Sequence, residues 1–211
     1  MQQAKRHELG ARSDKRRLVW GLLILILSGF PTLAGALEWQ VYFSPQGGAT
    51  DAIVQAIAGA QKSIYLQAYS FTSAPIAKAL LAAHKRGVKV EAILDKSNRT
   101  AKYSAADFLL HAGIPTYIDA AHSIAHNKVM IIDEELVITG SFNFTKAAEL
   151  NNAENLLLLR DRDLAARYLD NYRQHRAHSE LYQGKEQPQA KKTAPADDRW
   201  LQYLFHQIFG R

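Results

Sequence analysis

The sequence has 211 residues, enough for one α/β domain with additional segments, and 47% of them are hydrophobic, which excludes a wholly disordered chain. It contains no cysteine, so disulfides, thiol nucleophiles and thiolate metal sites are excluded. The formal net charge is +6, but residues 1–36 contribute +4, from six Lys or Arg and two acidic residues, which leaves 6 − 4 = +2. A surface that binds phosphate must therefore be local rather than a property of the whole chain.

The first 36 residues have the layout of a secretory signal peptide. A basic region is followed by the apolar run LVWGLLILIL and by the small residues Ala34, Gly35 and Ala36. We expect cleavage after Ala36, and therefore a periplasmic or secreted protein. The alternative is an uncleaved membrane anchor over residues 18–36, which is barely long enough to span a bilayer and is weakened by Pro31.

The rest of the chain alternates strand-like and helix-like segments. Hydrophobic periodicity and turn residues predict strands at 38–43, 63–71, 88–95, 114–119, 128–133, 136–141 and 154–160. Helices are predicted between the first two strands, at 73–87, at 104–113, near 144–150, and from Arg162 to about His178. The first of these helices has Thr50 or Asp51 as its candidate N-cap. This alternation predicts an α/β domain with a mixed, largely buried β-sheet flanked by helices.

The composition changes after His178. Residues 179–199 are polar and resemble a linker, and residues 200–211 form an amphipathic segment whose apolar face predicts a helix. We expect this helix to pack on the domain or on a partner subunit. The alternative is docking on a membrane surface through residues 200–209. The chain shows no internal repeat, so it holds one copy of any motif that it carries.

Polar side chains stand at the ends of two otherwise apolar strands. His126 and Lys128 are two residues apart and therefore point to the same side of a strand. Ser141 and Asn143 have the same spacing after the next strand, and a hairpin would bring all four to one edge of the sheet. Asp133 falls in the turn of this hairpin rather than on the face that His126 and Lys128 share.

These residue types together suit chemistry on a phosphodiester. Lys, Asn and Ser can hold the non-bridging oxygens and stabilise the charge of the transition state. A histidine can attack phosphorus, and a carboxylate such as Glu154 on its other ring nitrogen would fix the tautomer. Taken singly, each residue is more simply explained as a core histidine, a turn former or a helix cap. Their joint placement indicates a site, and this chemistry requires no metal.

The same residues carry a resemblance to a known family. The pattern H-x-K-x-x-x-x-D, followed by GSFN and a later Glu in NNAEN, resembles the signature of the phospholipase D superfamily. The upstream segments QAYSFTSAPIAKAL and SPQGGATDAIVQAI are similar to the small bacterial endonucleases of that superfamily, which carry a single motif. The resemblance runs from about Trp39 to Tyr172 and implies a phospholipase D-like catalytic domain at 37–178.

The resemblance implies hydrolysis in two steps without a metal or cofactor. One histidine forms a phosphohistidine, and a second protonates the leaving oxygen and then activates water. Because this chain has one motif, the second His126 would come from a second subunit of a homodimer. Lys128 and Asn143 would bind the phosphate, Ser141 would support it, and Glu154 would orient the imidazole. Asp133 would be structural, pairing near the site.

The substrate is less clearly indicated. Lys96, Arg99 and Lys102 form a local basic cluster that could follow a nucleic-acid backbone, and Tyr69 and Phe71 could stack on bases. The ordinary alternatives are solvated loop charges and core aromatic residues. A further histidine lies four residues before His126, but this spacing would form a metal pair only on a helix, so no metal ligand is predicted.

Three functions fit the sequence. The leading hypothesis is an endonuclease of low specificity that cleaves DNA, with RNA left open as a second substrate. The alternative is a phospholipase D or phosphatidyltransferase that acts on phospholipid head groups. A third hypothesis is a non-enzymatic binding module with a degenerate site, against which the intact His126, Lys128, Asn143 and Glu154 argue.

Overall fold

The computed structural model describes residues 38–102 and 104–185. The predicted signal peptide and the predicted C-terminal helix lie outside these residues. Within the described ranges, no helix combines the length and the hydrophobicity needed to cross a membrane.

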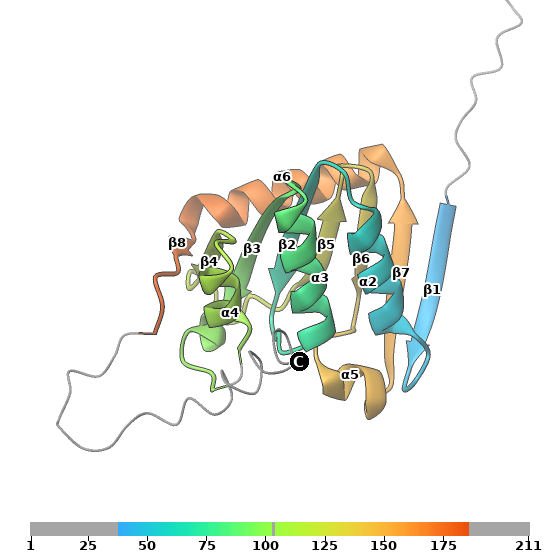
Figure 1. Cartoon of the computed structure of the whole chain (residues 1–211), viewed down its shortest axis with the longest axis horizontal. Coiled ribbons are helices and arrows are strands. Elements are labelled where there is room, and N and C mark those ends of the chain that lie inside the picture. Colours follow the sequence, from blue (N-terminus) through green and yellow to red (C-terminus); the bar gives the residue numbers. More distant parts are fainter. Residues whose placement is uncertain (1–37, 103, 186–211) are drawn as a thin grey trace, which may run out of the picture. The chain divides into compact units, whose positions relative to one another are not determined.

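The strands form one mixed sheet, which confirms the predicted α/β class (Figure 1). In the described residues the order is β1-β7-β6-β5-β2-β3-β4-β8. The central strands β2, β3 and β4 run parallel to one another, and every other neighbouring pair is antiparallel. The strands are β1 (Glu38–Ser44), β2 (Ser63–Ala68), β3 (Lys89–Asp95), β4 (Thr116–Asp119), β5 (Lys128–Ile132), β6 (Leu136–Gly140), β7 (Glu154–Arg160) and β8 (Glu180–Leu181).

Helices cover both faces of the sheet. The larger core lies between the sheet and α2, α3 and α4, and a smaller one, which includes Leu169 and Tyr172, lies under α6 on the other face (Figure 1). The predicted loop after β3 begins with a 3₁₀ turn at Lys96–Arg99. The helices are α2 (Ala49–Gly59), α3 (Ala74–Lys85), α4 (Ala106–His111), α5 (Lys146–Leu150) and α6 (Arg162–His178).

The start of α2 differs from the prediction of an N-cap at Thr50 or Asp51. The helix begins at Ala49, after Gly48 in a left-handed conformation (φ 79°). The carboxylate of Glu149 accepts hydrogen bonds from the backbone N–H groups of Gly48 (3.2 Å) and Thr50 (2.7 Å). A side chain about 100 residues away in sequence therefore satisfies the free donors of the first turn.

The sheet is predicted to be largely buried, and β5 agrees, because its five residues are all buried. In β7, Leu156 and Leu158 are buried against the larger core, whereas Leu157 and Leu159 are partly exposed. The reason is that α6 packs over β2, β4, β5 and β6 and leaves the end of the sheet at β7 and β1 less covered.

The folded domain extends past His178, which corrects the predicted start of the linker. Glu180 and Leu181 pair with β4 as strand β8. Tyr182 is buried, and its hydroxyl donates a 2.5 Å hydrogen bond to the carboxylate of Asp107. Because this segment is mostly polar, its composition did not predict the short strand β8 or the buried side chain of Tyr182.

Candidate active site at one edge of the sheet

Strand direction brings the predicted site residues to one edge of the sheet. Because β5 is antiparallel to both β2 and β6, and β6 is antiparallel to β7, the end of β2, the start of β5, the end of β6 and the start of β7 meet there. His126 and Lys128 lie at the start of β5, Ser141 and Asn143 follow β6, and Glu154 opens β7. The predicted convergence of these five residues on one edge is thus present in the topology.

His126 is exposed, and Lys128 beside it is buried. The Nζ atom of Lys128 lies 3.0 Å from Nδ1 of His126 and 3.0 Å from its carbonyl oxygen. The ring of Tyr69, just after β2, lies 4.6 Å from the imidazole between centroids, and the ammonium lies 5.1 Å from the centre of the same ring. Tyr69 therefore packs against both groups and restricts their motion.

The charge on Lys128 is held in an unfavourable place. Burial lowers the pKa of Lys128 below its ordinary value, and the negative charge of Glu154 partly offsets this effect. Burial has removed water from this ammonium group. An anionic ligand beside it would stabilise its positive charge. This is the environment expected of a cation that binds a phosphate oxygen.

Ser141 and Glu154 form a second part of the site. The Ser141 hydroxyl donates a 2.6 Å hydrogen bond to Glu154 and accepts one from the backbone N–H of Asn155 (3.1 Å). The other carboxylate oxygen of Glu154 accepts from Asn152 (3.0 Å). Among the described residues, Glu154 thus contacts Ser141 and Asn152, and Nδ1 of His126 faces Lys128 instead. The predicted contact between Glu154 and the imidazole is absent from this arrangement.

Gly140 allows the segment that carries Ser141 to approach β7. Its backbone has φ 146°, and a Cβ atom added there would lie 2.2 Å from the carbonyl oxygen of Asn155. Only glycine fits this close approach without displacing backbone. The glycine of the GSFN segment therefore has a steric role in placing the serine.

Asn143 supplies an uncommitted polar atom. Its side-chain oxygen is buried and has no hydrogen-bond partner among the described residues. An unpaired buried polar atom costs roughly 1–3 kcal/mol, and the described residues hold two more, Ser63 Oγ and Gln67 Oε1. The free oxygen of Asn143 is an acceptor, so it could bind a ligand that donates a hydrogen bond, whereas a phosphate oxygen would need the NH₂ group of the same amide.

Asp133 lies elsewhere. It follows β5, at the end of the strand opposite to Lys128, and its carboxylate accepts hydrogen bonds from the backbone N–H groups of Gln61, Lys62 and Ser63 at 2.6 to 2.9 Å. These bonds outweigh the effect of burial and lower the pKa of Asp133. The prediction of a structural role agrees with these contacts, but the predicted position near the site is wrong. Asp133 joins the hairpin turn to the start of β2.

The predicted substrate-binding residues fall into two groups. Tyr69 lies at the site, whereas Phe71 is fully buried against Phe144 and cannot stack on a base, which corrects that prediction. Lys96 donates to the carbonyl oxygen of His122 (3.0 Å), and Arg99 pairs with Glu180 (2.5 Å). Lys102 is exposed in the same loop, after the end of β3. The basic cluster is therefore at the correct edge, but none of its three side chains is without a partner.

The sequence analysis missed two buried aspartates at the ends of parallel strands. Asp95 ends β3 and accepts a hydrogen bond from the backbone N–H of Ala125 (2.8 Å), next to His126. Asp119 ends β4, and three histidine rings surround its carboxylate. The available signal was the position of an acidic residue at the end of a buried strand, at the edge where the other site residues were expected.

This arrangement places an imidazole, an ammonium, a hydroxyl and an amide on an exposed edge, next to one carboxylate. The combination provides a nucleophile or general acid and donors for the oxygens of a phosphoryl group. Fold and site together define a phosphodiesterase of the α/β class.

Comparison with known proteins identifies the family. The family model described as "Cardiolipin synthase, PLD-like domain" matches residues 53–176. The protein named phospholipase D from Rickettsia typhi is 47% identical over 140 residues, which cover 66% of this chain and 69% of that protein. The mitochondrial cardiolipin hydrolase of Xenopus laevis is 36% identical over 110 residues, which cover 52% of each chain.

The fold has a close solved counterpart. The crystal structure of Nuc, a phospholipase D family member from Salmonella typhimurium, aligns with a TM-score of 0.67 and 40% identity, over 69% of this chain and 98% of that one. The chain described here belongs to the phospholipase D superfamily, as its motif indicated. It is accordingly a phosphodiesterase of that superfamily.

Proposed function

We propose that this protein is an endonuclease of low specificity that cleaves DNA, and also RNA, through a phosphohistidine intermediate at a site shared by two subunits. The observation that carries the proposal is the pairing of exposed His126 with buried Lys128, on the edge where Ser141, Asn143 and Glu154 also lie. No metal ion has a step in this mechanism.

The contact between Lys128 and His126 suggests how substrate binding prepares the nucleophile. An ammonium cannot accept a hydrogen bond, so Lys128 donates to Nδ1, and the neutral ring carries its proton on Nε2. A bound phosphate competes for the ammonium and releases Nδ1. The proton then moves to Nδ1, and Nε2 becomes free to attack phosphorus. The imidazole of the second subunit starts protonated and donates to the leaving oxygen, so a bell-shaped dependence of rate on pH is expected.

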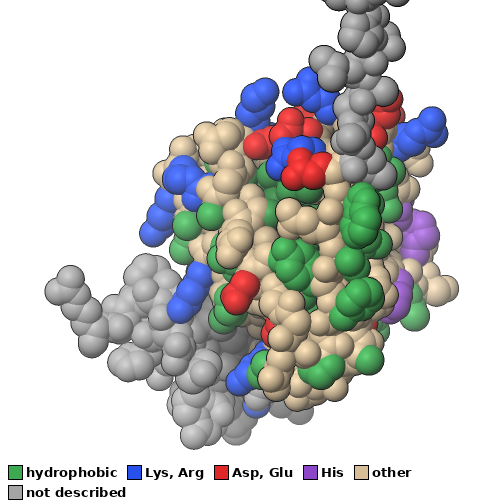
Figure 2. Space-filling model, turned by 90° about the vertical axis from the view of Figure 1, so that its right-hand side faces the viewer, with side chains coloured by type: hydrophobic (Ala, Val, Ile, Leu, Met, Phe, Trp, Pro, Cys, Tyr) green, Lys and Arg blue, Asp and Glu red, His purple; other side chains and the backbone are tan. Residues whose placement is uncertain are grey.

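An apolar strip beside the site supports pairing of two chains. Trp39, Val41 and Phe43 of β1 are 58%, 37% and 65% exposed and alternate along one face of the strand. Figure 2 looks onto the side of the molecule where β1 lies and shows hydrophobic side chains gathered along it. The strip ends next to Ser44, which is paired with Glu154 of the site. A second copy that covered this strip would lie against the active-site edge.

Mixing subunits tests whether the site is shared. We expect an equimolar, randomly paired mixture of the native protein and His126→Asn to retain about one quarter of the activity of the same total amount of native protein, because only native pairs hold two imidazoles. Independent sites would retain about one half. The pairs are formed by refolding together, and retention of one half would contradict the shared site. A mixture with His111→Asn, which changes an exposed histidine of α4, is the control and should keep full activity.

We propose a nucleic acid rather than a lipid as the substrate because the domain is small and carries a single H-x-K-x-x-x-x-D motif. Nuc is covered over 98% of its length by part of this chain, so it too consists of one such domain. The relatives named phospholipase D and cardiolipin hydrolase favour the lipid alternative.

We further propose that the protein acts in the periplasm or is secreted. Residues 18–36 or 200–209 would provide any membrane contact.

Cleavage of plasmid DNA in excess EDTA tests the proposed activity. We expect nicking to continue with the chelator present, and vesicles of phosphatidylcholine to release no choline under the same conditions. Release of choline with intact plasmid would replace the nuclease by the lipid alternative. If nicking is lost in EDTA and restored by added metal, at a temperature where the protein is still folded, the metal-free mechanism is contradicted.

A further inference from the structure

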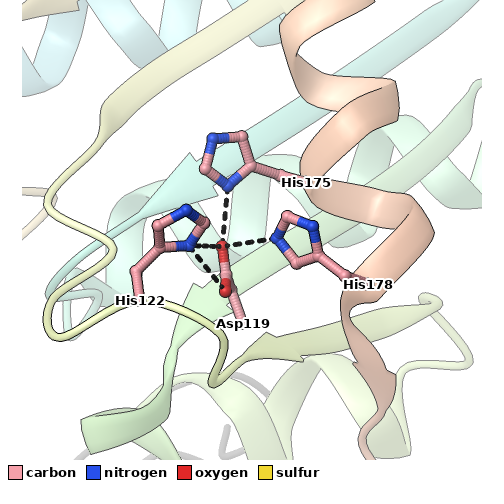
Figure 3. Close-up of side chains that lie close together, drawn as sticks. All are labelled: Asp119, His122, His175 and His178. Atoms are coloured by element: carbon pink, nitrogen blue, oxygen red, sulfur yellow. Dashed lines mark hydrogen bonds and ion pairs between the residues drawn. The ribbon is translucent and has the colours of Figure 1, made fainter.

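The most unusual group outside the active site is a cluster of three histidines around one buried aspartate (Figure 3). Asp119 ends β4, His122 lies in the loop that follows, and His175 and His178 lie in the last turn of α6. Half of the six histidines in the described residues thus meet at one carboxylate. Each residue offers one ligand atom, and these four atoms lie within 4.8 Å of one another.

We infer that Asp119, His122, His175 and His178 bind one Zn²⁺ ion, which holds the end of α6 to the loop that leads to the active site. Three imidazole nitrogens and one carboxylate oxygen are a donor set that suits zinc, and they suit magnesium or calcium poorly, because those ions prefer oxygen. Four protein ligands leave no open position, as in structural rather than catalytic zinc sites. The inference is independent of the proposed function and revises the prediction that the chain has no metal ligand.

The distances agree with tetrahedral coordination. From the Asp119 carboxylate, Nδ1 of His175 lies at 2.7 Å, Nδ1 of His122 at 3.2 Å and Nε2 of His178 at 3.4 Å. Atoms bound to one tetrahedral zinc at its usual bond lengths are about 3.3 Å apart, and the centres of histidine rings bound to it are about 5 Å apart. The three ring centres here are 4.9, 5.2 and 5.4 Å apart. Small rotations of the side chains would therefore suffice to bind the ion.

Two hydrogen bonds restrain the aspartate and the loop of the cluster. The backbone N–H of Ala121 donates to Oδ1 of Asp119 (3.1 Å), and Lys96 donates to the carbonyl oxygen of His122. The first contact holds the Asp119 carboxylate, as hydrogen bonds to ligating carboxylates do in metal sites, and the second holds the backbone of the loop that carries His122.

A metal ion could reach the histidine cluster from the solvent on one side. The side chain of Asp119 is 0% exposed, whereas those of His175, His178 and His122 are 17%, 39% and 46% exposed. An ion can reach the rings from solvent and bind a carboxylate that lies beneath them. Because His122 is four residues before His126, the bound ion would also restrain the loop that positions the catalytic imidazole.

The test compares metal binding by the full-length chain and by paired histidine variants. The chelator-treated protein is titrated with Zn²⁺, and with Co²⁺, whose visible absorption is intense only in tetrahedral sites. We expect His122→Gln/His178→Gln to lose one high-affinity ion per chain. His84→Gln/His111→Gln and His126→Asn, which alter histidines outside the cluster, should keep it. In the parent, a thousandfold excess of free Zn²⁺ over its dissociation constant should raise the melting temperature by about 10 °C, and the cluster variant should lose this shift.

Two results would overturn the inference: equal binding by the parent and the cluster variant, or no ion bound to the parent at micromolar Zn²⁺. The second result is decisive even if the cluster variant fails to fold. Mg²⁺ should give neither binding nor a shift in melting temperature. Nuclease activity is followed separately in the cluster variant with EDTA present. Loss of zinc binding with retained cleavage supports both conclusions, whereas loss of cleavage in the folded variant would show that the loop before His126 needs the cluster, and it would leave the zinc inference intact.

Discussion

Replacing His126 by asparagine is expected to lower turnover by about 10⁴-fold or more, because the nucleophile and the general acid are lost together. Asparagine keeps a polar side chain of similar size at an exposed position, so the fold should be unaffected. The measurement is the rate of plasmid nicking, with circular dichroism and the melting temperature as checks of folding.

The matched control is His111→Asn, the same change at an exposed histidine in the last turn of α4. It should leave turnover unchanged. Substantial nicking by the purified His126→Asn protein would remove the nucleophile from the proposed mechanism. Trapping of a phosphorylated protein from the native chain, but not from the variant, would locate the intermediate.

Replacing Lys128 by methionine is expected to lower turnover by about 10²–10³-fold, because the ammonium that would hold the developing charge on phosphorus is removed. The unfolding free energy should change by no more than about 1 kcal/mol. The variant loses a charge that burial disfavours and keeps an unbranched side chain against Tyr69. Both quantities are measured on the same preparation, by nicking and by denaturant unfolding.

Lys89→Met is a close control for this change. Lys89 also lies over a tyrosine ring, with Nζ 5.2 Å from the centre of Tyr65, but it stands at the start of β3, on the opposite edge of the sheet. Its replacement should leave turnover intact. Equal effects of the two substitutions would show that loss of a positive charge anywhere on the domain is enough, which would contradict a local role for Lys128.

The sheet and most of its helices could be predicted because short-range patterns specify them. The run KVMIIDEELVITG holds two apolar strands and the turn between them, and β5 and β6 form there as expected. The alternation of strands and helices gave the mixed α/β class, and the i, i+2 spacing placed His126 with Lys128. These features depend on neighbours within a few residues or on one hairpin.

The features that could not be predicted depend on contacts between distant segments. Glu149 caps α2 from about 100 residues away, and Asp133 binds N–H groups at the start of β2 and just before it instead of reaching the site. The histidines of α6 meet His122 only after the helix has packed across the sheet. Hydrophobic periodicity contains no information about such pairings, because it shows which face of an element is buried and not against which residue.

The pairing of β1 with β7 bears on when the protein becomes active. Ser44, at the end of β1, accepts a hydrogen bond from the backbone N–H of Glu154, 110 residues later. Contacts of such long range close large loops and form late in folding, after local hairpins such as that of β5 and β6. We therefore expect a nascent chain to complete the surroundings of Glu154 only after β7 has been synthesised. Such a delay would keep a phosphodiesterase inert during its synthesis.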